Sequence, residues 1–343
     1  MSGPRLTRRA LLGRVGALLP MAPVLGTMLS GTACGTAGAQ IRMLPEPVPA
    51  GAADVALTPR PERDRSRTSV SFDLVPYRGL GCWIDVFDWS MSYRSAPSQP
   101  AVGPHSLAAL AARGVRTVYL QTARYDRPDR RDDLLEPDRL WAMCDAAHAA
   151  GMRVVGWYLP THVDADQDLR RVLRIVQDAS FDGLALDIES RMEPDVGLRN
   201  RRVAELVAAV RAAVGPAAVL GAVVVPPTTM QDVNPDYWPG FDWAMLAEQC
   251  GVFLPMNYWT NRLASSPWRD AGASSAENIR RLRVLGGRAD QPVHVVGGIA
   301  SLCSAGEVEA MVAAAHREGA IGASLYDLAT TPEHLWPPLA ALG

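Results

Sequence analysis

Eight short apolar segments recur along residues 76–343 of this chain, and most of them are followed by a helical pattern. Apolar runs of this kind are typical of buried parallel strands. The predicted strands are Gly81–Phe87, Thr117–Gln121, Arg153–Tyr158, Gly183–Ile188, Val219–Val225, Val252–Met256, Val293–Gly297 and Ala320–Leu325. Strands that alternate with helices predict an α/β fold, and eight such units in one domain favour a (β/α)8 TIM barrel.

A doubly wound open sheet is the alternative fold. Such a sheet usually carries a glycine-rich phosphate loop directly after its first strand. The segment Gly81-Cys82-Trp83-Ile84-Asp85 is not a loop of that kind. The barrel is therefore the favoured architecture, and in a barrel the functional side chains lie at the C-terminal ends of the strands.

Helix-capping residues support the helices predicted between these strands. The Ser274-Ser275 pair is typical of a helix start, which predicts a helix from Ser275 to Leu285. A left-handed residue is favoured just past a helix end. Four glycines occupy such positions, namely Gly114, Gly151, Gly215 and Gly319. Cys82 and Cys144 fall on apolar faces, where we expect buried thiols.

Composition excludes several functional classes. All 34 basic residues are arginine, and the absence of lysine excludes Schiff-base, pyridoxal-phosphate and P-loop lysine chemistry. The formal net charge of −2 argues against a nucleic-acid binder, which normally carries a basic stripe. The six histidines show neither HxH nor HExxH spacing, so we expect no metal site and no cofactor.

Residues 1–39 have the features of an export signal. Arg8 and Arg9 precede the apolar stretch Val15–Leu29, an order that resembles the twin-arginine signal. Two processing patterns remain open: cleavage before Gln40, or lipidation of Cys34. Both predict export by the twin-arginine route to the extracellular space or the cell envelope, the second with a lipid anchor at the membrane surface.

The composition changes again after the signal. Residues 40–75 are rich in Pro, Ala, Arg and Asp and show no apolar period, which predicts a flexible linker. Residues 76–343 are long enough for one barrel. We therefore expect a single domain after a signal and a linker, and a monomer.

The fourth predicted strand carries two acidic residues at its C-terminal end. Because side chains alternate along a strand, Ala185, Asp187 and Glu189 share the face directed into the barrel mouth. Two such carboxylates lie about 6–7 Å apart, and in a partly dry site like charges favour keeping one of them protonated. Glycoside cleavage requires a carboxylic acid near a carboxylate. The alternative is structural: the acids cap the next helix or pair with Arg191.

The same strand resembles a known motif. Residues 182–189 read DGLALDIE, which is similar to the fourth-strand signature DGxDxDxE of family 18 glycoside hydrolases, the chitinase-like barrels. The resemblance implies that Glu189 is the proton donor and Asp187 the acid beside it. Ala185 stands where the family has another Asp, so the residue that shares a proton with the second Asp is missing here.

Two further segments carry weaker resemblances. Pro255-Met256-Asn257-Tyr258-Trp259 resembles the MxYD motif of the same family, with Trp259 in place of Asp, which implies that the Tyr258 hydroxyl reaches the cleavage point. For Tyr258 alone, ordinary aromatic packing is the alternative. The first strand around Asp85 resembles the opening of family 25 lysozymes, and the whole layout resembles a group of exported actinobacterial proteins in the glycoside hydrolase superfamily.

Aromatic and polar residues at other strand ends predict a sugar-binding rim. Sugars stack on aromatic faces and hydrogen-bond to fixed polar groups. The predicted substrate-binding residues are Trp83, Asp85, Gln121, Trp157, Tyr158, Asn257, Trp259, Tyr326 and Asp327. For each tryptophan, packing in the core is the alternative.

These patterns predict an exported glycoside hydrolase that acts on a cell-wall or extracellular polysaccharide. Glu189 would be the general acid/base, Asp187 would stabilise positive charge at the anomeric carbon, and Tyr258 would donate a hydrogen bond. Asp85 or Asp327 would supply a separate nucleophile if the N-acetyl route fails. The alternative is a non-catalytic barrel that binds carbohydrate or belongs to the envelope.

Overall fold

The computed structural model describes residues 72–93, 100–126 and 133–343. Eight parallel strands pair in the order β6-β5-β4-β3-β2-β1-β8-β7, and bridges between Phe253 and Val293 and between Met256 and Val296 join the two edge strands. The strands are β1 (Gly79–Ile84), β2 (Thr117–Gln121), β3 (Arg153–Tyr158), β4 (Gly183–Ile188), β5 (Gly221–Val224), β6 (Val252–Pro255), β7 (His294–Ile299) and β8 (Gly322–Tyr326). The predicted (β/α)8 barrel is confirmed.

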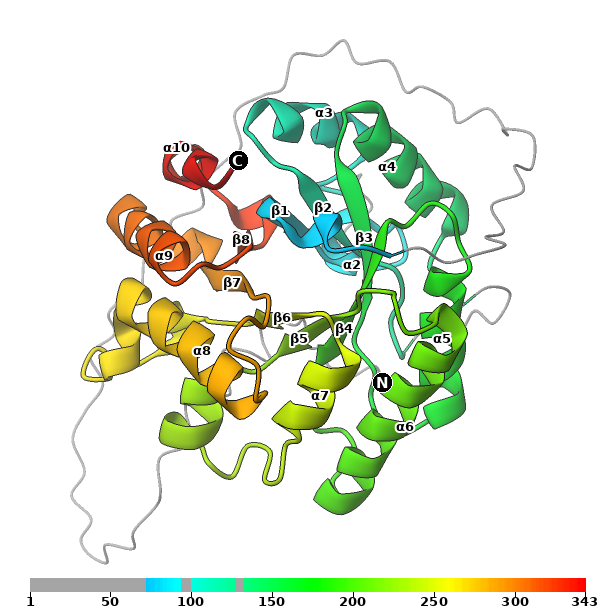
Figure 1. The fold of residues 1–343 in the computed structure, drawn as a ribbon. Coiled ribbons are helices and arrows are strands. Elements are labelled where there is room, and N and C mark those ends of the chain that lie inside the picture. Colours follow the sequence, from blue (N-terminus) through cyan, green and yellow to red (C-terminus); the bar gives the residue numbers. More distant parts are fainter. Residues whose placement is uncertain (1–71, 94–99, 127–132) are drawn as a thin grey trace, which may run out of the picture. The chain divides into compact units, whose positions relative to one another are not determined.

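The helices form an outer layer around the strands (Figure 1). They are α2 (Val86–Trp89), α3 (Pro104–Ala112), α4 (Pro137–Ala149), α5 (Ala165–Val176), α6 (Val196–Val214), α7 (Trp243–Gln249), α8 (Ala271–Leu285), α9 (Ala305–Arg317) and α10 (Trp336–Leu339). None of the helices in the described ranges is both long and apolar enough to cross a membrane.

The N-terminal predictions fall mostly outside the described residues. These predictions concern the export signal, Cys34 and the greater part of the linker, all within residues 1–71. Phe72 is described, is 2% exposed, and accepts a 2.9 Å hydrogen bond from the backbone N–H of Val219 with its carbonyl oxygen. Phe72 and the partly buried Leu74 therefore pack on the barrel core, although the composition had assigned them to the linker.

Several predicted element boundaries differ from the observed ones by one to four residues, and capping aspartates explain two of these differences. β1 ends at Ile84 rather than Phe87, because Asp85 Oδ1 accepts hydrogen bonds from the backbone N–H groups of Phe87 and Asp88 and starts α2. Helix α8 begins at Ala271 with Asp270 as its N-cap, four residues earlier than Ser275. In both cases a short carboxylate side chain satisfies the unpaired N–H groups of a first turn.

Other local predictions are confirmed. Gly114, Gly151, Gly215 and Gly319 all have positive φ, between 64° and 86°, just past helix ends. Cys82 and Cys144 are buried.

Aromatic side chains fill the barrel interior. The ring of Trp83 on β1 stacks on Tyr119 of β2 with a centroid distance of 4.4 Å, and it meets Trp157 of β3 edge-on at 5.7 Å. Trp83 Nε1 donates a 2.8 Å hydrogen bond to Ser324 Oγ on β8. Because these contacts join β1, β2, β3 and β8, the side chains that make them all face the interior of the barrel.

A hydrogen-bonded chain continues from this aromatic layer to the N-terminal end of the barrel. The Ser324 hydroxyl lies 3.0 Å from His294 Nε2, and His294 Nδ1 donates to the carbonyl oxygen of Tyr77 at 2.9 Å. The Tyr77 hydroxyl in turn donates to the carbonyl oxygen of Leu184 at 2.7 Å. A Cβ at Gly183 would lie 3.0 Å from that hydroxyl, so glycine there leaves room for Tyr77.

Candidate active site

Strand β4 brings Asp187 and Glu189 to the C-terminal end of the barrel. Trp157 faces inward, and Ala185 is its register partner on β4. Register partners in a sheet point to the same face, so Ala185 and, two residues later, Asp187 face the interior. Asp187 has no exposed surface, and Glu189, just beyond the strand end, is 6% exposed. Two buried carboxylates therefore lie at the mouth, where catalytic groups of such barrels are found.

The aromatic core gives a physical reason for Ala185. Its register partners are Trp157 on β3 and Gly221 on β5, and all these positions are fully buried. The indole rings of Trp83 and Trp157 occupy the interior at this level. Both tryptophans were predicted to bind substrate, but their burial and mutual contact give them a packing role instead. A small side chain at position 185 accommodates the rings.

The loop after β5 supports the backbone of Glu189. The Tyr237 hydroxyl donates a 2.9 Å hydrogen bond to the carbonyl oxygen of Glu189, whose N–H donates to the carbonyl oxygen of Asp187 at 3.1 Å. Burial raises the pKa of Tyr237, and the negative charges of Glu189 and Asp187 raise it further. The phenol therefore stays a protonated donor. No sequence pattern singled out Tyr237.

Two arginines lie on the aromatic residues of this loop. Arg191 Cζ is 5.0 Å from the ring centroid of Tyr237, and Arg199 Cζ is 4.1 Å from that of Trp238. Arg199, in the first turn of α6, is 2% exposed and donates to the carbonyl oxygen of Glu193 at 3.3 Å. Arg191 is exposed, and no carboxylate in the described part of the chain lies within ion-pair distance of it. The predicted alternative, an ion pair between Arg191 and the β4 acids, is not formed.

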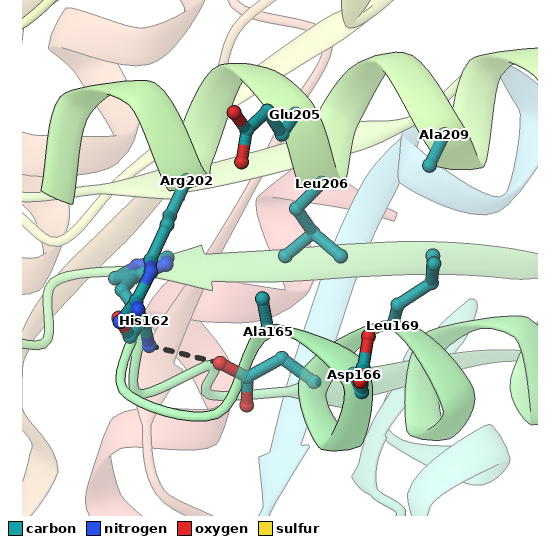
Figure 2. A pocket seen from close by; sticks show the side chains of 9 residues that line it. His162, Ala165, Asp166, Leu169, Arg202, Glu205, Leu206 and Ala209 are labelled. Carbon is teal, nitrogen blue, oxygen red and sulfur yellow. Dashed lines mark hydrogen bonds between the residues drawn. The ribbon is translucent and has the colours of Figure 1, made fainter. Parts of the chain in front are cut away.

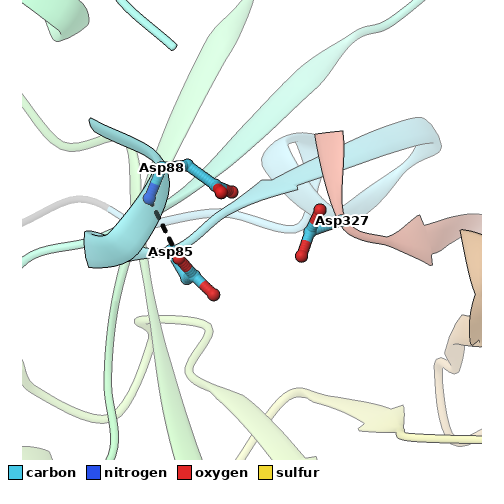
Figure 3. A group of neighbouring side chains, drawn as sticks. All are labelled: Asp85, Asp88 and Asp327. Carbon is cyan, nitrogen blue, oxygen red and sulfur yellow. Dashed lines mark hydrogen bonds between the residues drawn. The ribbon is translucent and has the colours of Figure 1, made fainter. Parts of the chain in front are cut away.

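Three aspartates gather at the ends of β1 and β8 (Figure 3). Asp85, Asp88 and Asp327 each offer a carboxylate oxygen within 4.8 Å of the other two, and all three are buried. We refer to them as the aspartate group. Asp327 Oδ1 also accepts hydrogen bonds from the N–H and hydroxyl of Thr330. Ca²⁺ and Mg²⁺ prefer carboxylate oxygens as ligands. The search of the sequence for histidine spacing could not detect a group made of aspartates.

Tyr326 connects the aspartate group with the segment that follows β6. Its hydroxyl donates a 2.8 Å hydrogen bond to Asp85 Oδ2, and its ring centroid lies 6.1 Å from that of Tyr258. Asp85 is thus held by donors from its own turn and from β8. The structure brings together Asp85, Tyr258, Tyr326 and Asp327 of the predicted site.

Gln121 and Tyr158 have other partners. Gln121 Oε1 accepts a 3.0 Å hydrogen bond from the Val86 N–H and so holds the turn between β1 and α2. The Tyr158 hydroxyl donates to Asp168 Oδ1 at 2.8 Å and accepts from Arg171 at 3.2 Å, both on α5. The prediction that Tyr158 faces the substrate is therefore corrected: with Trp157 pointing inward, its neighbour must face the helix layer.

Asn257 and Trp259 are also placed outside the mouth. Asn257 Nδ2 donates to Ser275 Oγ of α8 at 2.9 Å and is 2% exposed. Trp259 has no exposed surface and packs against β7, where a Cβ at Gly297 or Gly298 would lie 3.0 or 2.9 Å from its ring. The predicted substrate contacts of Asn257 and Trp259 are therefore corrected. Each side chain packs against or hydrogen-bonds to a neighbouring element instead.

A pocket of about 230 Å³ lies between α5 and α6, in the helix layer (Figure 2). The residues that line it are His162, Ala165, Asp166, Asp168, Leu169, Arg202, Glu205, Leu206 and Ala209. Burial, with the positive charges of Arg199 and Arg202, lowers the pKa of His162 to about 4, so this histidine is neutral near pH 7.

Comparison with solved structures finds the same barrel in several glycoside hydrolases. An endo-β-1,4-mannanase from Thermotoga petrophila has a TM-score of 0.55 at 12% identity, over 75% of this chain and 69% of that chain. A class V chitinase from Pseudomonas fluorescens Pf-5 has a TM-score of 0.55 at 12% identity, over 77% and 99%. ZgEngAGH5_4, solved with a cellotriose, has a TM-score of 0.53 at 15% identity, over 81% and 99%.

The fold is one that glycoside hydrolases use. At these identities the likeness concerns the fold, and function has to be argued from the site. Neither a protein-family model nor a curated protein sequence matches this chain.

Proposed function

We propose that this protein is a glycoside hydrolase that acts on a cell-wall or extracellular polysaccharide. The observation that carries the proposal is the pair of buried carboxylates, Asp187 and Glu189, at the C-terminal end of β4. The barrel around them is shared with a mannanase and a chitinase. Catalytic residues of such barrels come from the C-terminal strand ends.

In the proposed mechanism, Glu189 protonates the oxygen of the departing sugar. Asp187 remains ionised and stabilises the positive charge that develops at the anomeric carbon. Tyr258, whose ring lies near Tyr326 in the mouth, donates a hydrogen bond to the substrate. Asp85 or Asp327 acts as the second carboxylate if the reaction proceeds through a covalent intermediate or an activated water.

The test is a polysaccharide-hydrolysis screen of the full chain beside Glu189→Gln. This substitution keeps the shape of the side chain and removes its proton. We expect the rate to fall by ~10²–10⁴-fold, the usual contribution of general acid catalysis, with little change in glycan binding. Glu205→Gln, at an exposed position on α6, is the matched control and should leave the rate unchanged. If Glu189→Gln hydrolyses as fast as the native protein, the acid must be sought in the aspartate group.

A non-catalytic carbohydrate-binding barrel is the second candidate. The observation that favours it is the packing around Ala185, where Trp157 and Trp83 take the space in which the family 18 motif has a carboxylate. This candidate predicts that the native protein binds glycans and hydrolyses none of them in the same screen.

We also propose that the protein reaches its substrate by twin-arginine export. The support is the order of Arg8, Arg9 and the apolar run Val15–Leu29. Replacing both arginines with alanine should abolish export, and undiminished export would refute the proposal. Intact-mass measurement of the exported protein distinguishes a chain that starts at Gln40 from one that is lipidated at Cys34.

A further inference from the structure

Charged side chains divide the mouth of the barrel into two halves. The aspartate group lies over β1 and β8. Two guanidinium groups come from the segment after β4, on the opposite side: Arg191 precedes α6, and Arg199 lies in its first turn. In the strand order β4 and β8 are four positions apart, which places them on opposite sides of an eight-stranded barrel.

Arg191 is placed to bind an anion. Its guanidinium lies on the Tyr237 ring at 5.0 Å, two residues beyond Glu189, and the side chain is exposed. A guanidinium stacked on an aromatic face keeps its in-plane N–H donors available, and their geometry matches that of a carboxylate. In the described ranges no protein carboxylate pairs with these donors.

Arg199 adds positive potential behind Arg191. It is 2% exposed, lies 4.1 Å from the Trp238 ring centroid, and its Nε has no hydrogen-bond partner in the described part of the chain. Burial lowers the pKa of Arg199, and the charge of Arg191 lowers it further, against the opposing negative charge of Glu193. Buried cations are normally paired, and the printed hydrogen bond of Arg199 goes to a backbone oxygen, that of Glu193, rather than to a carboxylate.

The charge balance at this side of the mouth depends on the proposed function. The charges that act on Tyr237 are those of Glu189, Asp187, Arg191 and Arg199, so when Glu189 carries the proton that it donates, Asp187 faces two guanidinium groups there. The carboxylate of Glu193, which also acts on Arg199, pairs with Arg202 at 2.9 Å. The immediate surroundings of Tyr237 would therefore hold more positive than negative charge.

We propose that Arg191, backed by Arg199, binds the carboxylate of a uronic-acid residue, so that the substrate is an anionic polysaccharide. A guanidinium holds a carboxylate through two parallel hydrogen bonds. The aspartate group on the other side repels the same carboxylate, which directs the acidic sugar to the β4–β5 side. This substrate class rests on the proposed glycosidase function, whereas carboxylate binding can be measured without hydrolysis.

The experiment compares chemically matched polymers. Polygalacturonate and hyaluronan are each tested beside their carboxyl-reduced forms, which keep the linkages and lose the charge. Binding to the full chain is measured by affinity electrophoresis, and hydrolysis is followed by reducing-end release. The variants are Arg191→Gln, Arg191→Lys and, as a matched control, Arg201→Gln, an exposed arginine on α6.

The native protein should bind at least one uronate polymer more tightly than its reduced form, and high salt should weaken only the uronate complex. Arg191→Gln should lower uronate affinity by ~10-fold or more, as expected for a charge-assisted hydrogen bond, and leave affinity for the reduced form unchanged. Arg191→Lys should retain part of the preference, and Arg201→Gln all of it. If Arg191 served only to tune the β4 acids, Arg191→Gln would shift the pH–rate profile equally on both polymers.

Equal binding of both members of every pair, no binding at all, or a preference that survives Arg191→Gln overturns the proposal. The outcomes also separate it from the glycosidase function. If the protein hydrolyses a reduced polymer, if this hydrolysis depends on Glu189, and if uronate is not preferred, the glycosidase function is supported and the anionic substrate is refuted. If uronate binding depends on Arg191 but no polymer is hydrolysed, the anion site is supported and the glycosidase function is refuted.

Discussion

The Tyr237 hydroxyl donates a 2.9 Å hydrogen bond to the backbone oxygen of Glu189 and thereby ties the loop after β5 to the end of β4. Tyr237 is 6% exposed, as is Glu189. The bond fixes the backbone from which the Glu189 carboxyl group extends, beyond the last residue of the strand. Supporting contacts of this kind keep a functional side chain in a productive geometry.

Tyr237→Phe should therefore lower both stability and activity. The substitution removes the hydroxyl group that donates to the buried carbonyl oxygen of Glu189. Loss of this donor should lower the free energy of unfolding by about 1–3 kcal/mol. The fall in hydrolysis rate should be smaller than that of Glu189→Gln. Urea unfolding and rate measurements check both points. Tyr125→Phe, a partly exposed tyrosine on the loop after β2, is the control and should behave as native.

Replacing Ala185 by the aspartate of the family 18 motif should damage the fold rather than increase hydrolysis. Position 185 is fully buried beside Trp157, with no space or partner for a charge. Burying such a carboxylate should lower the free energy of unfolding by about 3 kcal/mol or more. Thermal unfolding measures the effect, with Ala108→Asp on the exposed face of α3 as control. A variant with native stability and higher activity would contradict this account of the core.

Stability should depend on pH through His294. Burial lowers the pKa of His294 to about 4 from an ordinary value of 6.5. Between these values the unfolded chain binds a proton that the folded chain does not, so the free energy of unfolding falls as pH is lowered. The contribution is complete above pH 6.5 and is lost by pH 4, with a slope of about 1.4 kcal/mol per pH unit.

Urea unfolding at several pH values tests this dependence. His294→Gln should flatten the dependence between these two pKa values, although His162, whose pKa is also lowered to about 4, keeps part of it. His334→Gln, at an exposed position, should keep the native slope. If the dependence of the free energy of unfolding on pH is unchanged in His294→Gln, the contacts with Ser324 and Tyr77 do not favour the neutral form of His294.

Tyr326→Phe should release Asp85 from β8. The hydrogen bond from the Tyr326 hydroxyl to Asp85 Oδ2 joins two strand ends at the mouth. Removing a donor to a carboxylate should cost about 1.5–3 kcal/mol in the free energy of unfolding. A double-mutant cycle with Asp85→Asn measures the coupling. If the two substitutions are additive, the contact contributes nothing and Asp85 is positioned by its own turn alone.

The strands could be predicted because the apolar pattern of a buried parallel strand is local. β2, β3 and β4 have the predicted bounds residue for residue. The first strand was extended too far because Val86 and Phe87 are apolar, and pattern alone does not show that Asp85 caps a helix there. The N-cap of α8 was missed for a related reason: Ser274 and Ser275 are also good capping residues, but they lie inside a helix that Asp270 starts.

The candidate site was predicted in part. Alternation along β4 placed Asp187 in the mouth because it depends only on the period of a strand. The aspartate group was not expected, since its members lie just after the first and the last strand, far apart in the sequence. Arg191 and Tyr237 were also not recognised as a pair, because they meet only where the loops after β4 and β5 approach each other.

The sequence by itself determined which side chains stand at the ends of the strands and which face of β4 carries the acids. Only the tertiary structure decided which of these side chains share the mouth. Tyr158, Asn257 and Trp259 stand at strand ends as predicted, yet their partners are α5, α8 and β7. The physical reason is that strand period and helix capping depend on near neighbours in sequence, whereas the partner of a side chain at a strand end depends on the packing of elements distant along the chain.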